Sequence, residues 1–130
     1  MTLFESDYAR LEIDERRRVI RYTRSSKPFA SIDDSLATFR AVGLASSQID
    51  RSRYGLLSDV REAPGRNDPA FEAAVAKHRN DLFAGFAKRA SLVRTVAGAL
   101  QVQRINREMH SPDVHVFHDE AEALAYLAAH

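Results

Sequence analysis

One stretch, Tyr54–Ala63 (YGLLSDVREA), constrains the fold more than any other part of the chain. It begins with an apolar run that suits a strand buried on both faces, and it turns polar from Ser58 onward. A proline–glycine pair then ends it, and a long amphipathic helix follows, with Asp68 as its N-cap and Pro69 in its first position. A strand, a polar exit, a loop and a helix form the unit at which open α/β sheets place their binding crevices. We therefore expect a central strand here, with a ligand site at its carboxyl end.

The rest of the chain alternates between strand and helix patterns. Residues 8–13 alternate in polarity and residues 18–24 are rich in β-branched and aromatic types, so these two segments predict an antiparallel hairpin. The patterns that follow predict helices over residues 31–43, 68–86, 99–109 and 119–128, and further strands over 90–96 and 114–118.

This order, β-β-α-β-α-β-α-β-α, predicts a single α/β domain over residues 1–130. Strands that alternate with helices indicate a mostly parallel central sheet, and the opening hairpin should supply one antiparallel edge strand. Right-handed crossovers should spread the helices over the faces of the sheet. A chain of 130 residues fits one domain of this kind.

Composition limits the classes of function. The formal net charge of +1 argues against a dedicated nucleic-acid binder, which carries a concentrated positive surplus. Five arginines do fall between Arg16 and Arg24, and they indicate either an anion-binding ribbon or a solvated hairpin whose charges deter edge pairing. The lack of cysteine excludes disulfides and thiolate metal sites. With no signal-peptide pattern and no long apolar run, we expect no transmembrane segment and a cytoplasmic location.

Motifs that would indicate an enzyme are missing. The sequence contains no G-x-S-x-G elbow, no H-E-x-x-H pair and no glycine-rich phosphate loop. His115 and His118 are three residues apart on an expected strand, so they should point to opposite faces and not share a metal. We therefore expect no catalytic residues, no metal and no cofactor.

One group of polar residues does suggest a ligand site. Asp59, Arg61 and Arg66 follow the central strand, and Arg94 and Thr95 leave the next parallel strand. Both groups should meet at the carboxyl edge of the sheet, where a positive excess would suit a carboxylate or phosphate group. The alternative is that Asp59 and Arg94 form a structural ion pair that closes the sheet.

Three segments of the sequence resemble those of the SpoIIAA-like family, which belongs to the STAS and Sec14-related group. They are LLSDVREA before a capped helix, FAKRASLVRTVAGALQVQR, and VHVFHDEAEALAYL, whose last part is similar to the family's closing pattern of Val-Phe, an acidic residue and Ala-Leu. The resemblance covers roughly residues 8–129 and implies the STAS-like fold. Its motifs mostly report how strands meet helices, so they specify the fold better than the function.

One departure from that family concerns regulation. STAS domains that antagonise anti-sigma factors carry Asp-Ser-(Ser/Thr)-Gly at the start of the helix after the central strand, and a partner kinase phosphorylates the serine. The matching stretch here, Gly65–Phe71, contains no hydroxyl. A phosphoserine switch adds charge at a chosen helix terminus, so we expect this switch to be absent.

Two classes of function follow from the resemblance. The first is a non-enzymatic regulatory or binding module for a protein partner or a small ligand. The second is a carrier for a small amphipathic or lipid-like molecule. The expected partner is thus a regulatory protein or a small anionic or amphipathic ligand, and the sequence leaves a homodimer open. A carrier should contain an apolar cavity, whereas a regulatory module should have only a small pocket.

Overall fold

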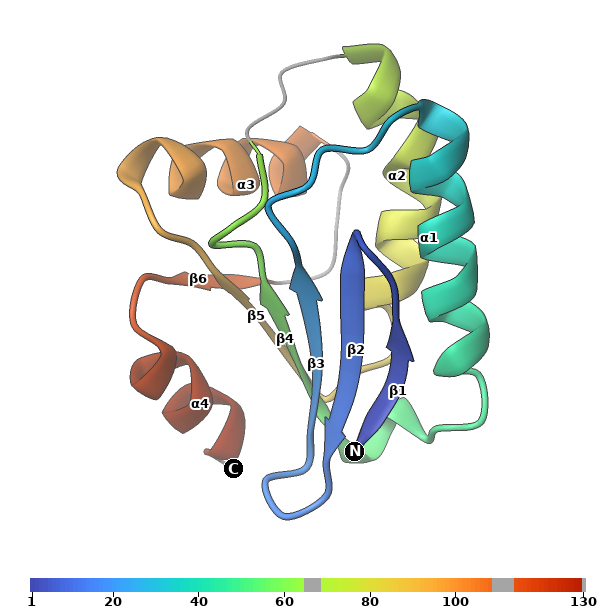
Figure 1. The fold of residues 1–130 in the computed structure, drawn as a ribbon. Coiled ribbons are helices and arrows are strands. Elements are labelled where there is room, and N and C mark those ends of the chain that lie inside the picture. The colour runs from blue at the N-terminus through green and yellow to red at the C-terminus, as the bar shows by residue number, and fades with distance from the viewer. Residues whose placement is uncertain (65–68, 109–113, 130) are drawn as a thin grey trace.

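The computed structural model describes residues 1–64, 69–108 and 114–129 (Figure 1). Its elements, in chain order, are β1 (Thr2–Glu5), β2 (Ala9–Asp14), β3 (Val19–Arg24), α1 (Ile32–Ala45), the short 3-10 helix η1 (Arg51–Arg53), β4 (Gly55–Asp59), α2 (Pro69–Phe83), β5 (Lys88–Leu92), α3 (Val96–Glu108), β6 (His115–Phe117) and α4 (Glu120–Ala128).

The strands form one sheet whose spatial order, β1 to β6, repeats the order of the chain. Strand β2 runs antiparallel to both β1 and β3, whereas β3, β4, β5 and β6 pair in parallel. The prediction of an α/β fold with a mostly parallel sheet is therefore confirmed. The prediction that the hairpin of β2 and β3 supplies the edge strand is wrong, because β1 occupies that edge and β2 lies between β1 and β3. Strand β1 escaped prediction because Leu3 and Phe4 are adjacent and a register shift interrupts its pairing, so it shows no clean alternation.

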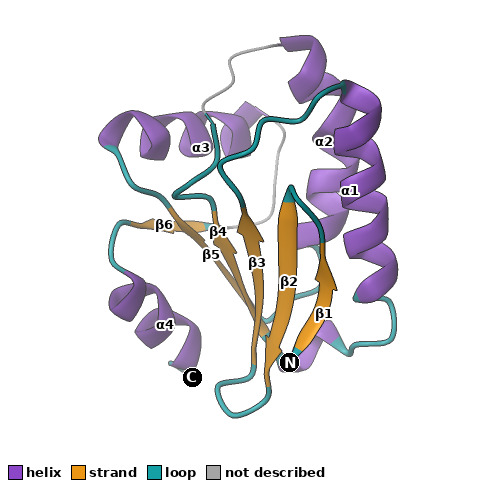
Figure 2. Ribbon diagram, viewed as in Figure 1, coloured by secondary structure: helices purple, strands orange, loops and turns teal. Residues whose placement is uncertain are grey.

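Helices cover both faces of the sheet (Figure 2). Helices α1 and α2 pack together on one face, and α4 lies on the other. The three parallel connections all advance in the same direction across the sheet, so right-handed crossovers bring α1 and α2 to the same side. Helix α4 follows the last strand of the sheet and is free of that constraint. Helix α3 lies across the carboxyl end of the sheet (Figure 1).

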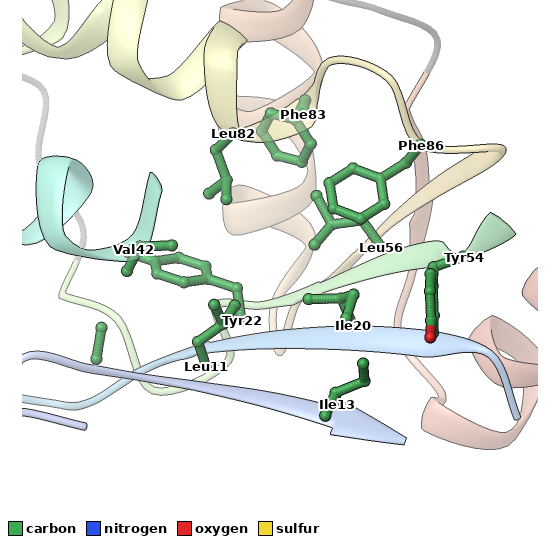
Figure 3. Close-up of a cluster of buried hydrophobic side chains, with 11 residues drawn as sticks. Leu11, Ile13, Ile20, Tyr22, Val42, Tyr54, Leu56, Leu82, Phe83 and Phe86 are labelled. Carbon is green, nitrogen blue, oxygen red and sulfur yellow. The ribbon is translucent and has the colours of Figure 1, made fainter. Parts of the chain in front are cut away.

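Two apolar clusters lie on the two faces. The first, between the sheet and helices α1 and α2, is shown in Figure 3 and includes Leu11, Ile20, Val42, Leu56, Leu82 and Phe83. The second, beneath α4, contains Val19, Leu57, Ala90, Leu92, Ala123 and Leu127. The predicted amphipathic character of α2 is confirmed, since Val75 and Leu82 are buried while Ala73 and Lys77 are exposed. Phe86 is also buried but lies beyond the helix end, and Phe71 is only half-buried.

Capping residues explain most of the helix boundaries. The Ser31 hydroxyl accepts a hydrogen bond from the Asp34 amide at 3.1 Å and so caps the start of α1. Asp119 caps α4 in the same way, through the Ala121 amide at 3.0 Å. Gly85 has a φ of 86°, a left-handed conformation that favours glycine, just after α2.

Several predicted boundaries are wrong. Helix α1 continues through Gly43, which was expected to end it, as far as Ala45. Strand β5 ends at Leu92 and α3 begins at Val96, three residues earlier than predicted, because the Thr95 hydroxyl accepts from the Gly98 amide at 2.9 Å and caps the helix. Gly98 therefore lies in the first turn of the helix and not in the turn before it.

Candidate functional site

Residues near the carboxyl ends of β3, β4 and β5 divide between the two faces of the sheet. Successive side chains on a strand point to opposite faces. Asp59 at the end of β4 faces α4, whereas Ser58 beside it faces the α2 side, as do Tyr22 on β3 and Ser91 on β5. This end of the sheet thus carries two separate groups of polar residues.

The group on the α4 side is a cluster of four charged residues, Arg21, Asp59, Arg61 and Glu120, called the ion cluster below. The buried Asp59 carboxylate accepts from Arg21 Nη2 at 2.7 Å and from Arg61 Nη2 at 2.9 Å. Glu120 Oε1 accepts from the same two nitrogens at 2.6 and 3.1 Å. Two arginines and two carboxylates give the ion cluster no net charge.

Hydrogen bonds within the ion cluster shift the pKa values of its carboxyl groups. Burial alone would raise the pKa of Asp59, but the hydrogen bonds from Arg61 and Arg21 outweigh it and lower that pKa below 3.8. The hydrogen bond from Arg21 lowers the pKa of Glu120 below 4.5. Both carboxyl groups are therefore ionised at neutral pH and held by their arginines.

The predicted ligand site is only partly assembled. Asp59 and Arg61 do meet, but as members of the ion cluster, so the expected positive excess around Asp59 is absent. The proposed pair of Asp59 with Arg94 is wrong, because Arg94 lies within 3.4 Å of Glu62 in an exposed ion pair. Thr95 uses its hydroxyl to cap α3. Arg66 lies outside the residues that the structure describes.

The other face holds a cavity of about 860 Å³. It lies between the sheet and helices α2 and α3, and the loops that follow β3, β4 and β5 complete its walls. Its size is within the range of small-molecule sites. Most of the exposed surface in it is apolar, and its apolar side chains include Phe39, Phe71, Val75, Leu82, Val93 and Ile105.

Tyr22 brings an unused hydrogen-bonding group to the cavity. Its side chain is 3% exposed, and its hydroxyl has no hydrogen-bond partner within the described part of the chain. Among the described residues, the Thr23 hydroxyl, on the opposite face, is the other buried side-chain atom of this kind. Burial raises the pKa of Tyr22 to about 12, so its hydroxyl keeps its proton at neutral pH and can donate.

Arg24, two residues further along β3, is a buried cation on the same face. It is 8% exposed, and its guanidinium donates to the backbone carbonyls of Tyr8 and Lys27, the latter at 3.1 Å. The Phe29 ring lies over it, with 4.1 Å between the guanidinium carbon and the ring centroid. Burial lowers the pKa of Arg24. No carboxylate forms an ion pair with it among the described residues.

Polar contacts hold α3 against α2 beside the cavity. Arg79 Nη2 donates to Asn106 Oδ1 at 2.7 Å, and Arg104 Nη2 donates to Glu72 Oε1 at 2.9 Å. Burial lowers the pKa of Arg79 to about 10, which still leaves it charged at neutral pH. Glu72, an acidic residue of the cavity wall, is therefore already paired.

Sequence reasoning missed both Tyr22 and Arg24. It treated the arginines of the hairpin as one set, but only Arg16–Arg18 are exposed at the turn, whereas Arg21 joins the ion cluster and Arg24 is buried. The prediction of a wholly solvated hairpin is therefore wrong for Arg21 and Arg24. The period of two along β3 was the available signal, since it places Ile20, Tyr22 and Arg24 on one face.

Comparison of the chain with protein-family models, with curated proteins and with solved structures gives no match. None of the helices in the described ranges is long and apolar enough to cross a membrane. Within the same ranges, no group of three or more acidic, histidine or cysteine side chains is arranged to hold a metal ion.

Proposed function

We propose that the chain is a non-enzymatic, SpoIIAA-like binding module, and that it holds a small amphipathic molecule in the cavity between the sheet, α2 and α3. The cavity is the observation that carries this proposal. An apolar space of about 860 Å³ is what the carrier hypothesis calls for, and it exceeds the small pocket expected of a purely regulatory module. The family resemblance supports the proposal from the side of the sequence.

The lining of the cavity suits an amphipathic ligand better than a wholly polar one. Aromatic and aliphatic side chains from α2 and α3 would contact an apolar body, and burial of such a body is favourable by roughly 25 cal/mol per Å². The polar groups of the cavity include the hydroxyls of Tyr22, Ser58 and Ser91 on the sheet, and charged side chains such as Arg24 and Arg79 also line it. This combination of mostly apolar walls and placed polar groups is typical of small-molecule sites.

A protein partner remains the second candidate, and one surface feature favours it. Val96 and Leu100 are 72% and 61% exposed, and their spacing of four places them on one face of α3. A regulatory partner would be expected to cover this face.

Two measurements test the carrier proposal. An organic extract of the purified protein should contain a copurified amphipathic molecule by mass spectrometry. Added 1-decanol should raise the melting temperature of extracted protein, because a ligand that binds only the folded state stabilises it.

A pair of tryptophan variants on α3 locates the binding. Val102→Trp places a large ring in the cavity wall and should abolish the decanol effect, whereas Val96→Trp on the exposed face should preserve it. The proposal fails if decanol leaves wild-type protein unchanged, or if Val102→Trp responds as wild type does.

A further inference from the structure

We infer that the polar end of the ligand is a single acidic group, a carboxylate, and that it binds between the Tyr22 hydroxyl and the Arg24 guanidinium, beneath Phe29. This inference rests on the proposed function, because it requires that the cavity take a ligand. It adds the chemical class of the ligand and the direction in which it lies, with its head at the end of β3 and its apolar body toward α2 and α3.

The Tyr22 hydroxyl is the first reason. A buried polar group without a hydrogen bond destabilises a fold unless something else satisfies it. Tyr22 lines the cavity and is 3% exposed, and its hydroxyl is fully buried and lacks a partner within the described residues. The hydroxyl is protonated at neutral pH, so it can donate a hydrogen bond to a ligand acceptor.

The charge of Arg24 is the second reason. Buried charges in proteins are normally paired, yet the described partners of this guanidinium are two neutral carbonyls and an aromatic ring. A carboxylate at this point would neutralise the charge and complete its hydrogen bonds. A planar guanidinium suits a carboxylate well, since the two can form parallel hydrogen bonds.

Within the described residues, the other charges of the cavity wall have partners of their own. Arg61 belongs to the ion cluster, Arg94 faces Glu62, Glu72 is paired with Arg104, and Arg79 donates to Asn106. A ligand carboxylate therefore meets no uncompensated acid among the described residues of this wall. A ligand ammonium would meet Arg24 as a like charge, and a neutral alcohol would satisfy Tyr22 alone.

Three ligands with the same tail separate these cases: decanoate, 1-decanol and decylammonium, titrated by calorimetry at pH 8 and constant salt. We expect decanoate to bind roughly tenfold more tightly than decanol, because it gains a charge-assisted hydrogen bond, and decylammonium to bind most weakly.

Tyr22→Phe is the decisive variant, because it removes only the unpartnered hydroxyl. We expect it to weaken decanoate binding by roughly tenfold without lowering the melting temperature of ligand-free protein. Tyr54→Phe is the matched control. The buried Tyr54 donates to Glu15 Oε2 at 2.8 Å away from the cavity, so its loss should leave decanoate affinity unchanged.

Arg24→Gln provides a second variant, which should remove the preference for decanoate over decanol. The inference is overturned, while the proposed function stands, if wild-type protein binds decanol as tightly as decanoate or if Tyr22→Phe keeps full affinity for decanoate. If none of the three ligands binds, the inference and the proposed function are both overturned.

Discussion

Asp59 is the residue on which the polar end of the sheet most depends, because two arginines converge on its buried carboxylate. Asp59→Asn would leave Arg21 and Arg61 with only the shared Glu120. Removing one partner of a buried pair costs about 3–5 kcal/mol, but the side chains of Arg21 and Arg61 are 27% and 36% exposed, so we expect a loss of roughly 2 kcal/mol. Urea unfolding of wild type and Asp59→Asn at pH 7 measures this loss of stability.

Glu62→Gln is the control for this prediction. It breaks the exposed pair with Arg94, and exposed pairs contribute about 0–1 kcal/mol, so the midpoint of unfolding should hardly move. Equal losses in the two variants would show that the ion cluster contributes no more than a surface pair.

The ion cluster should also make the stability of the fold depend on pH in the acidic range. Asp59 and Glu120 have lower pKa values in the folded state than their ordinary 3.8 and 4.5, so the unfolded state binds protons first as the pH falls. Their contribution is complete above about pH 5 and is lost as the pH falls through the lower folded-state values. The difference between wild type and Asp59→Asn should therefore shrink between pH 5 and pH 3, and a constant difference would contradict the assignment.

At the scale of elements, the fit of α4 against the sheet depends on Gly55. A Cβ atom at this position would lie 3.0 Å from Leu127 Cδ2 and 3.3 Å from Leu127 Cβ. Gly55→Ala should therefore push α4 away from β4 and cost roughly 1–3 kcal/mol, the usual effect of overpacking.

A double-mutant cycle checks the cause. In a Leu127→Ala background the obstructing side chain is gone, so adding Gly55→Ala should lower the free energy of unfolding only slightly further. If the two losses simply add, the clash with Leu127 is not what makes glycine necessary here.

For the whole molecule, the two apolar clusters should unfold together, because they share strands β3 and β4. Val75→Asp would place a carboxylate among buried side chains on the α2 side and should destabilise the fold by about 3 kcal/mol. Circular dichroism and tyrosine fluorescence should still report one coincident transition. Ala73→Asp, on the exposed side of the same helix, should have little effect. Two separate transitions would show that the faces unfold independently.

The sequence was sufficient for the elements that have a regular pattern. The alternation in β2, the β-branched and aromatic residues of β3, and the amphipathic pattern of α2 are all local signals. It was insufficient where the signal is not local: Asp59 meets Arg21 and Glu120 from remote segments. The burial of Arg24 likewise depends on carbonyls and a ring supplied by loops, which no pattern within β3 specifies.

The sequential order of the strands has a consequence for how the chain folds. Neighbours in the sheet are neighbours in the chain, so each parallel pairing closes only one strand–helix–strand connection and none has to wait for a distant segment. The entropic barrier to each closure is correspondingly modest, and the sheet can grow outward from β1–β3 as the chain is synthesised. The side chains of Leu57 and Leu92, however, remain exposed on one face of the sheet until α4 packs against them. The interval between the pairing of β5 and the arrival of α4 is therefore when the nascent chain exposes most apolar surface to aggregation or to a chaperone.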